Sequence, residues 1–136
     1  MRRIDWVTLF ARLALGAAFL SGIASRFGWW GAGVGYGGWA NFVKYTGEVN
    51  AFMPRATIPF LAVAATAAEL VLGVAFVAGF RLRWTALASA ALLALFGVAM
   101  AVSFGPKEPL DYSVFSACAA ALLLARRVGD AGHRRQ

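Results

Sequence analysis

Long apolar runs separated by short polar segments dominate the chain. A helix of about 20 residues covers a bilayer core of roughly 30 Å, and the runs are close to that length. They predict membrane-spanning helices at residues 6–27, 58–80, 84–104 and 110–126. The pattern therefore predicts an all-α fold, in which an antiparallel four-helix transmembrane bundle forms one membrane domain over residues 1–136.

The segment between the first two runs is rich in glycine and aromatic residues. Dense glycine disfavours a continuous helix, and tryptophan favours the lipid–water interface. Trp29, Trp30 and Trp39 are thus expected in an aromatic loop, either as part of the interfacial belt or stacked on an aromatic ligand. Residues 39–53 are amphipathic and predict a short interfacial helix. At the other end, the polar residues 128–136 predict a loose tail.

Small residues recur every four positions in two of the predicted spans. The rows are Ala14, Ala18 and Gly22 in the first span, and Ala86, Ala90 and Ala94 followed by Gly97, Ala101 and Gly105 in the third. Such rows let helix backbones approach closely in lipid. Alanine is abundant here, so chance spacing is the alternative explanation for each row.

The composition predicts that this protein is surrounded by lipid and not by water. The chain is 61% hydrophobic and only 14% charged, against about a quarter charged in soluble domains. So little polar surface predicts a lipid bilayer as the partner. The net charge of +7 does not indicate a nucleic-acid partner, because the basic residues lie at the ends of apolar runs and form no stripe between exposed aromatic residues.

The basic residues also predict orientation. With four spans, both termini lie on one side of the membrane, and that side holds the larger basic set. This set is Arg2, Arg3, Arg81, Arg83, Arg126, Arg127, Arg134 and Arg135, against Arg26, Lys44, Arg55 and Lys107 on the other side. The asymmetry predicts a multi-pass cell-membrane protein with both termini in the cytoplasm.

Cysteine and histidine are scarce, which limits the chemistry. The single Cys118 allows no intrachain disulfide, and the single His133 lies in the polar tail. These counts argue against haem held by two histidines and against a metal site. Neither a covalently bound cofactor nor a catalytic residue is expected.

One acidic residue, Glu69, lies near the middle of the second apolar run. A carboxylate at that depth is costly, by roughly 2.5–3.5 kcal/mol or more, and needs a partner, a water-lined cavity or a proton. Counted from the helix ends, the depths of Arg12 and Glu69 in the membrane are close enough for the two side chains to meet. Arginine can bind a carboxylate through two hydrogen bonds. We predict an Arg12–Glu69 pair. It is interpreted as a structural ion pair, as the wall of a pocket for a quinone headgroup, or as a proton-exchanging transport site.

A second pair of charges is expected at the opposite rim. Arg26 ends the first span and Asp111 opens the fourth on the same side. They form a rim pair if the two helices are neighbours. The alternative is that Asp111 is only an N-terminal cap of the fourth helix.

The order of these residues resembles the DoxX family of small four-helix membrane proteins. The resemblance rests on the runs at residues 11–28, 68–102 and 111–125. The positions that carry it are Arg12, Gly16, Gly22, Glu69, Gly73, Gly79, Arg83 and Asp111. The family usually has a lysine soon after the first-helix glycine, where this chain has Arg26.

The resemblance implies a role in support of quinone-linked oxidation. It does not imply a particular reaction. The expected function is an accessory subunit of a membrane redox system, with a quinone as ligand, a redox subunit as partner and self-association into a homo-oligomer. The alternatives are a small proton-coupled transporter that uses Glu69 and a non-catalytic membrane scaffold.

Overall fold

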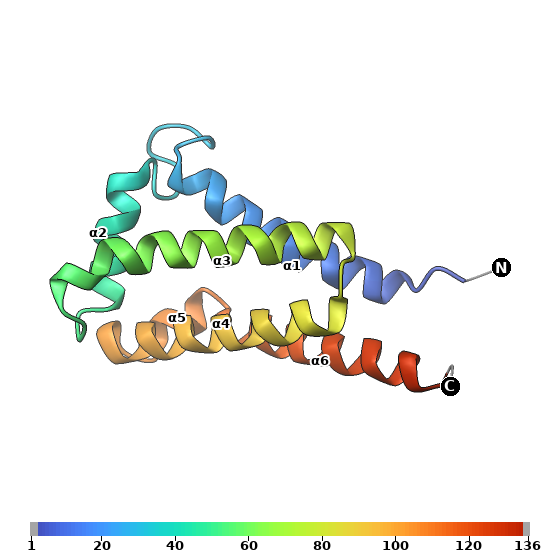
Figure 1. The fold of residues 1–136 in the computed structure, drawn as a ribbon. Coiled ribbons are helices and arrows are strands. Elements are labelled where there is room, and N and C mark those ends of the chain that lie inside the picture. Colours follow the sequence, from blue (N-terminus) through green and yellow to red (C-terminus); the bar gives the residue numbers. More distant parts are fainter. Residues whose placement is uncertain (1–2, 135–136) are drawn as a thin grey trace.

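The computed structural model describes residues 3–134, and helices make up most of that range (Figure 1). The elements, in chain order, are α1 (Trp6–Arg26), α2 (Trp39–Val49), the 3-10 turn η1 (Arg55–Thr57), α3 (Ile58–Ala78), α4 (Leu82–Phe104), α5 (Lys107–Asp111) and α6 (Val114–His133). No strand occurs among the described residues. The predicted all-α class is confirmed.

Three of the helices are long and apolar enough to cross a membrane. They are α1, α4 and the helix formed by η1 and α3, which spans Arg55–Ala78. Their bounds agree with the first three predicted spans to within a few residues. The prediction of a fourth span and of a four-helix transmembrane bundle goes beyond this finding.

The fourth apolar run is interrupted near its start. Helix α5 ends at Asp111, and α6 begins only after Ser113, whose backbone lies in the left-handed region with φ 56°. Asp111 is therefore the last residue of α5 and not the cap of α6. The loose-tail prediction is also wrong for residues 128–133, because α6 continues to His133; Arg135 and Gln136 lie outside the described residues.

Local sequence explains where the helices start and stop. The Asp5 carboxylate accepts a hydrogen bond from the Thr8 backbone N–H and caps α1. Pro59 occupies the first turn of α3, where its missing N–H costs nothing. At the end of α3, Gly79 adopts a left-handed conformation with φ 74°, which glycine tolerates best, and the chain reverses there into α4.

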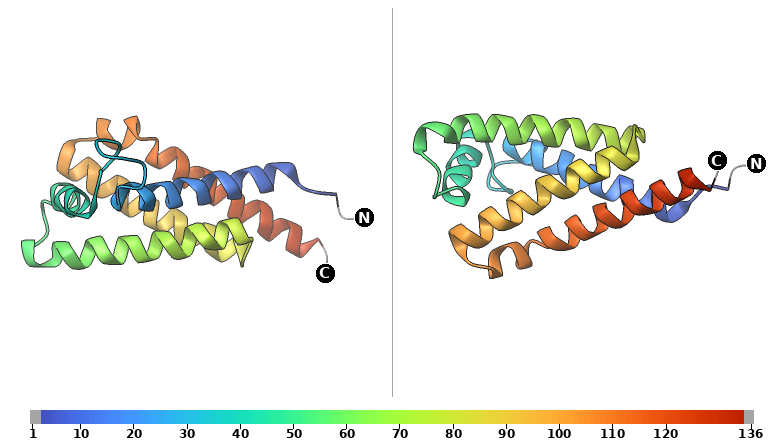
Figure 2. Two further views of the ribbon diagram at one scale, coloured as in Figure 1. Left: turned by 90° about the horizontal axis from the view of Figure 1, so that it is seen from above. Right: turned by 60° about the horizontal axis from the view of Figure 1, so that its bottom comes forward.

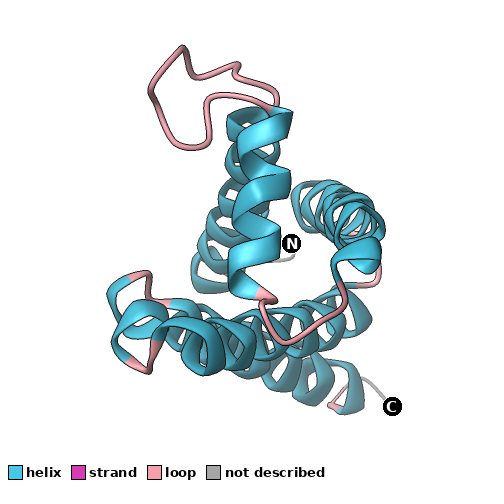
Figure 3. Cartoon of the chain, turned by 90° about the vertical axis from the view of Figure 1, so that its left-hand side faces the viewer, coloured by secondary structure: helices cyan, strands magenta, loops and turns pink. Residues whose placement is uncertain are grey.

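The long helices pack mainly in two pairs, α1 with α3 and α4 with α6 (Figure 2). Each pair runs in opposite directions. The start of α1, the α3–α4 turn and the end of α6 lie together at what we call the terminal end. The loop of residues 27–38, α2 and α5 lie at the opposite end, the loop end. Seen from there, α2 runs across the array (Figure 3).

Two glycines set the closeness of the first pair. A Cβ atom added at Gly16 on α1 would lie 3.0 Å from the Gly73 carbonyl oxygen on α3. One added at Gly73 would lie 3.1 Å from the Leu20 side chain. Both glycines are buried. The α1 and α3 backbones can therefore touch here because neither glycine carries a side chain.

A small apolar core joins the two pairs. Phe19 and Phe76 stack with ring centroids 6.3 Å apart, and Phe76 is fully buried. Ala86, Ala121 and Leu124 continue the core between α4 and α6. The outward faces carry large exposed apolar side chains, among them Phe60, Val71, Leu95, Val98 and Leu123. Such a surface is compatible with lipid contact.

Candidate functional site

Glu69 is buried in the middle of α3, and its partner is Arg26 at the end of α1. The Arg26 Nη2 and Glu69 Oε2 atoms form an ion pair whose two side chains are 5% and 8% exposed. Arginine and glutamate are rarely buried to this degree unless they are paired. The predicted buried carboxylate with an arginine partner is present, but the arginine is a different one.

The predicted Arg12–Glu69 pair is wrong. The Arg12 guanidinium lies at the C-terminal end of α3, where its Nη2 donates to the Val77 carbonyl oxygen at 3.4 Å. A Cβ atom at Gly79 would lie only 2.4 Å from Arg12 Nη1, so the missing side chain of Gly79 makes room for this arginine. A cation at a helix C-terminus also interacts favourably with the helix dipole. Arg12 thus stabilises the end of α3.

Arg26 has further contacts besides Glu69. Its Nη1 donates to the Thr66 Oγ1 atom at 2.9 Å, and Thr66 in turn donates to the Ala62 carbonyl oxygen. The Arg26 guanidinium carbon lies 3.9 Å from the centroid of the Phe42 ring on α2, a cation–π contact. The Arg26 Nε atom is buried and has no acceptor among the described residues. One donor of this arginine is therefore still open.

A cluster of aromatic rings lies at the loop end, and one of its members, Phe42, contacts Arg26 of the buried pair. We call this set the aromatic layer; its members are Phe27, Trp29, Tyr36, Trp39, Phe42, Tyr45 and Phe104. Each ring lies within 6.2 Å of another, centroid to centroid, from the α1 end through α2 to the end of α4. The layer therefore connects the end of α1 with α2 and the end of α4.

Of the loop tryptophans, Trp29 and Trp39 belong to the aromatic layer. Trp29 is nevertheless 74% exposed. Trp30 turns back to α1, where its indole N–H donates to Ser21. The predicted aromatic loop is therefore divided between rings that join the aromatic layer and a ring that ties the loop to α1.

The loop position over Arg26 depends on Ser25. The buried Ser25 hydroxyl accepts a hydrogen bond from the Tyr36 backbone N–H at 2.8 Å. A Cβ atom at Gly35 would lie 2.1 Å from this hydroxyl oxygen, and Gly35 also has a left-handed backbone with φ 60°. Glycine is thus required at this point for the loop to return to the helix end.

Two tyrosines of the aromatic layer have pKa values above the ordinary value of tyrosine. Burial raises the pKa of Tyr36, although the nearby Arg26 charge opposes the increase. Burial likewise raises the pKa of Tyr45, and the neighbouring Tyr36 adds to the effect. Their rings lie 5.4 Å apart. The loop end therefore combines two phenol groups with a buried guanidinium and a buried carboxylate.

The predicted rim pair of Arg26 and Asp111 does not form. Arg26 points inward to Glu69, whereas Asp111 pairs with Lys107 one turn earlier in α5. Both members of the Lys107–Asp111 pair are largely exposed. An exposed pair within one helical turn contributes little to stability and forms no site.

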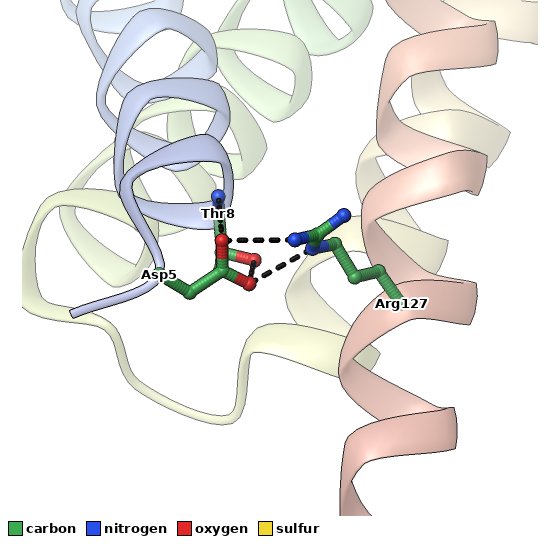
Figure 4. Close-up of polar contacts among 3 residues, drawn as sticks. All are labelled: Asp5, Thr8 and Arg127. Carbon is green, nitrogen blue, oxygen red and sulfur yellow. Dashed lines mark hydrogen bonds and ion pairs between the residues drawn. The ribbon is translucent and has the colours of Figure 1, made fainter. Parts of the chain in front are cut away.

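Sequence reasoning missed an ion pair at the terminal end (Figure 4). The Arg127 guanidinium on α6 donates to both carboxylate oxygens of Asp5, at 2.8 and 3.0 Å. Asp5 also accepts a hydrogen bond from the Thr8 hydroxyl at 2.7 Å. The signal was the capping pattern of an aspartate three residues before a threonine, ahead of an apolar run. The pair ties the start of α1 to α6.

This pair predicts a pH dependence. The hydrogen bonds from Arg127 and Thr8 hold the pKa of Asp5 below its usual range. The stabilisation of the folded protein by the Asp5–Arg127 pair is therefore fully present above the unfolded-state pKa of about 3.9. This stabilisation is lost as the pH falls below that value. We expect the melting temperature of the native protein to exceed that of Asp5→Asn at pH 6, and the difference to shrink towards pH 3. In an Arg127→Gln background most of this pH-dependent difference should vanish; an unchanged difference would show that Arg127 is not the cause.

No group of three or more histidine, cysteine, aspartate or glutamate side chains within residues 3–134 is placed to hold a metal ion. The Cys118 thiol donates to the Ala90 carbonyl oxygen at 3.2 Å and packs between α4 and α6.

Comparisons of the chain with protein-family models, with curated proteins and with solved structures find no match.

Proposed function

We propose that this protein is a multi-pass membrane protein that binds a quinone at its loop end and serves as an accessory subunit of a membrane redox system. In this proposal α6 is a fourth span, α2 lies at the interface, and both termini are cytoplasmic. The DoxX-like order of residues supports the same class of function. A redox subunit as partner and a homo-oligomeric assembly are parts of this proposal.

The observation that carries the proposal is the open donor of Arg26. Its Nε–H is buried without an acceptor among the described residues, next to a buried carboxylate. An unmade hydrogen bond at a buried charged group costs free energy, so an acceptor brought by a ligand would be favourable. A quinone offers carbonyl oxygens as acceptors and a flat ring that suits the neighbouring aromatic side chains.

The residues present fit both forms of such a ligand. Arg26 and the protonated Tyr36 can donate to a quinone carbonyl, and Glu69 can accept from a quinol hydroxyl. When bound, the quinone would supply two-electron redox chemistry. The chain's part is to hold the polar head and to exclude water with the aromatic layer.

The buried pair favours this proposal over proton-coupled transport. A transporter needs a Glu69 carboxylate that is free to take up and release protons, whereas the Glu69 carboxylate is paired with the permanent cation of Arg26. A purely structural scaffold would use the same pair only to fix the register of α1 on α3. A measurement of quinone binding distinguishes the two, because a purely structural scaffold binds no quinone.

Quinone binding can be read from the tryptophans of the loop end. Replacing Trp6 and Trp84 by phenylalanine leaves Trp29, Trp30 and Trp39 as the only indoles. We expect decylubiquinone, added to this variant in neutral detergent, to quench the remaining fluorescence in a saturable way. Removing both charges with Arg26→Gln and Glu69→Gln should weaken binding about tenfold or more, since charge-assisted hydrogen bonds contribute ~1.5–3 kcal/mol.

Arg12→Gln is the matched control, because it removes an arginine from the same helix at the other end. It should keep the affinity of the parent. Helix content measured for every variant separates lost binding from lost folding. Absence of saturable quenching in the folded parent, or equal affinity in the doubly neutralised variant, would reject the quinone site and leave the scaffold.

A further inference from the structure

A second polar site lies at the terminal end, between α4 and α6. A cleft of about 300 Å³ opens there, far from the Arg26–Glu69 pair. Its polar lining consists of Arg83, Arg126, Asp130 and His133, and its apolar lining includes Leu87 and Leu122. The quinone proposal assigns no role to these residues.

The charge balance of the cleft is positive. Asp130 is its only acidic lining residue, and it lies 4.0 Å from the Arg126 Nε atom, at the limit of an ion pair. Arg83 has no ion-pair partner among residues 3–134. The Arg83 guanidinium lies over Gly129, where an added Cβ atom would be 3.5 Å from its Nε atom. Because Gly129 has no side chain, the space beside the Arg83 guanidinium stays open.

The N-terminus of α4 adds to the positive potential. Arg81 precedes the helix in a left-handed conformation, and no side chain caps the first turn. The first backbone N–H groups of a helix therefore have no intrahelical partner, and the helix dipole favours a negative charge at this end. Arg83 belongs to the same turn.

The surroundings of the cleft suit the level of lipid headgroups. Trp84, next to Arg83, is 66% exposed, as expected for an aromatic residue at the interface. Leu87 and Leu122 lie one turn further into the apolar part of their helices. A ligand that fits both halves of the cleft has an anionic head and apolar chains.

We propose that this cleft binds the phosphate group of an anionic phospholipid. Arg83 and Arg126 hold the phosphate oxygens, and the acyl chains follow Leu87 and Leu122 along the two helices. Arginine suits this task because its planar donors match phosphate oxygens. The proposal rests on the membrane placement of α4 and α6, but not on the quinone site.

The test compares lipid retention in neutral detergent by native mass spectrometry. We expect the protein to retain phosphatidylglycerol in preference to phosphatidylcholine. The Arg83→Gln, Arg126→Gln variant should lose this preference, by about fivefold for each arginine, because a basic residue near a membrane surface contributes ~1 kcal/mol. Gly129→Leu should reduce retention without any change of charge, since its side chain fills the cleft.

The matched control removes two exposed charges from the loop end, with Lys44→Gln and Arg55→Gln. It should retain phosphatidylglycerol like the parent. Equal losses in the control and in the arginine variant would overturn the site, since binding would then follow net charge alone. Inorganic phosphate provides a further test. If inorganic phosphate at the same concentration as the lipid displaces it, the cleft recognises free phosphate and the lipid assignment is overturned.

Discussion

Arg26→Ala is expected to destabilise the protein by about 3–5 kcal/mol, because it leaves the Glu69 carboxylate buried without a cation. The loss also removes the hydrogen bond to Thr66 and the contact with the Phe42 ring. The measurement is the free energy of unfolding in mixed micelles, from a titration with a denaturing detergent followed by helix content.

Arg12→Ala is the control for this prediction. Arg12 lies on the same helix but contacts only the end of α3, so its removal should cost clearly less. Replacing Arg26 and Glu69 together by leucine should recover much of the loss, since well-packed apolar residues often match a buried ion pair. A larger loss for Arg12→Ala than for Arg26→Ala would contradict the pairing described here.

Gly16→Leu should be the second strongly destabilising change. Its Cβ atom alone would lie 3.0 Å from the Gly73 carbonyl oxygen, a backbone atom that cannot turn aside. α1 and α3 must then separate, which also disturbs the Phe19–Phe76 stack. Overpacking of this kind costs about 1–3 kcal/mol. The melting temperature in detergent and the cross-linking of cysteines placed on the two helices report the change.

Gly22→Leu provides the matched control on the same helix. An added Cβ atom at Gly22 meets nothing within 4 Å, so the same substitution has room there. Its effect on the melting temperature should be small. Similar losses at Gly16 and Gly22 would mean that the α1–α3 contact is not the cause, because leucine has a higher helix propensity than glycine and does not itself weaken α1.

The sequence pattern predicted the helices well and their contacts poorly. Apolar runs, Pro59 and the small residues around the turns mark where α1, α3 and α4 begin and end. The row of small residues in the third span is partly confirmed, since Ala86 and Ala90 are buried against α6. The row in the first span makes no such contact within the chain, because Ala14 and Ala18 are exposed and Gly16 makes the close contact with α3.

The error about Arg12 has a geometric cause. The prediction measured depth from helix ends that were assumed to be level. In the structure α1 and α3 are staggered, so that Arg12 lies beside Gly79 and Arg26 lies beside Glu69. Register between two helices is set by a few contacts such as Gly16 with Gly73, which apolar periodicity alone does not reveal. The need of Glu69 for an arginine was predictable, but the choice between two arginines was not.

The pairing of α1 with α3 has a consequence for biogenesis. Arg26 leaves the ribosome before Glu69, and even its hydrogen-bond partner Thr66 follows 40 residues later. At about 5–20 residues per second, the arginine waits for roughly 2–9 s without its counter-charge. During that interval α1 lacks α3, its main partner helix, whereas α4 and α6 are separated only by the short α5 segment. We therefore expect the nascent first helix to depend on the translocation machinery until the third helix is made.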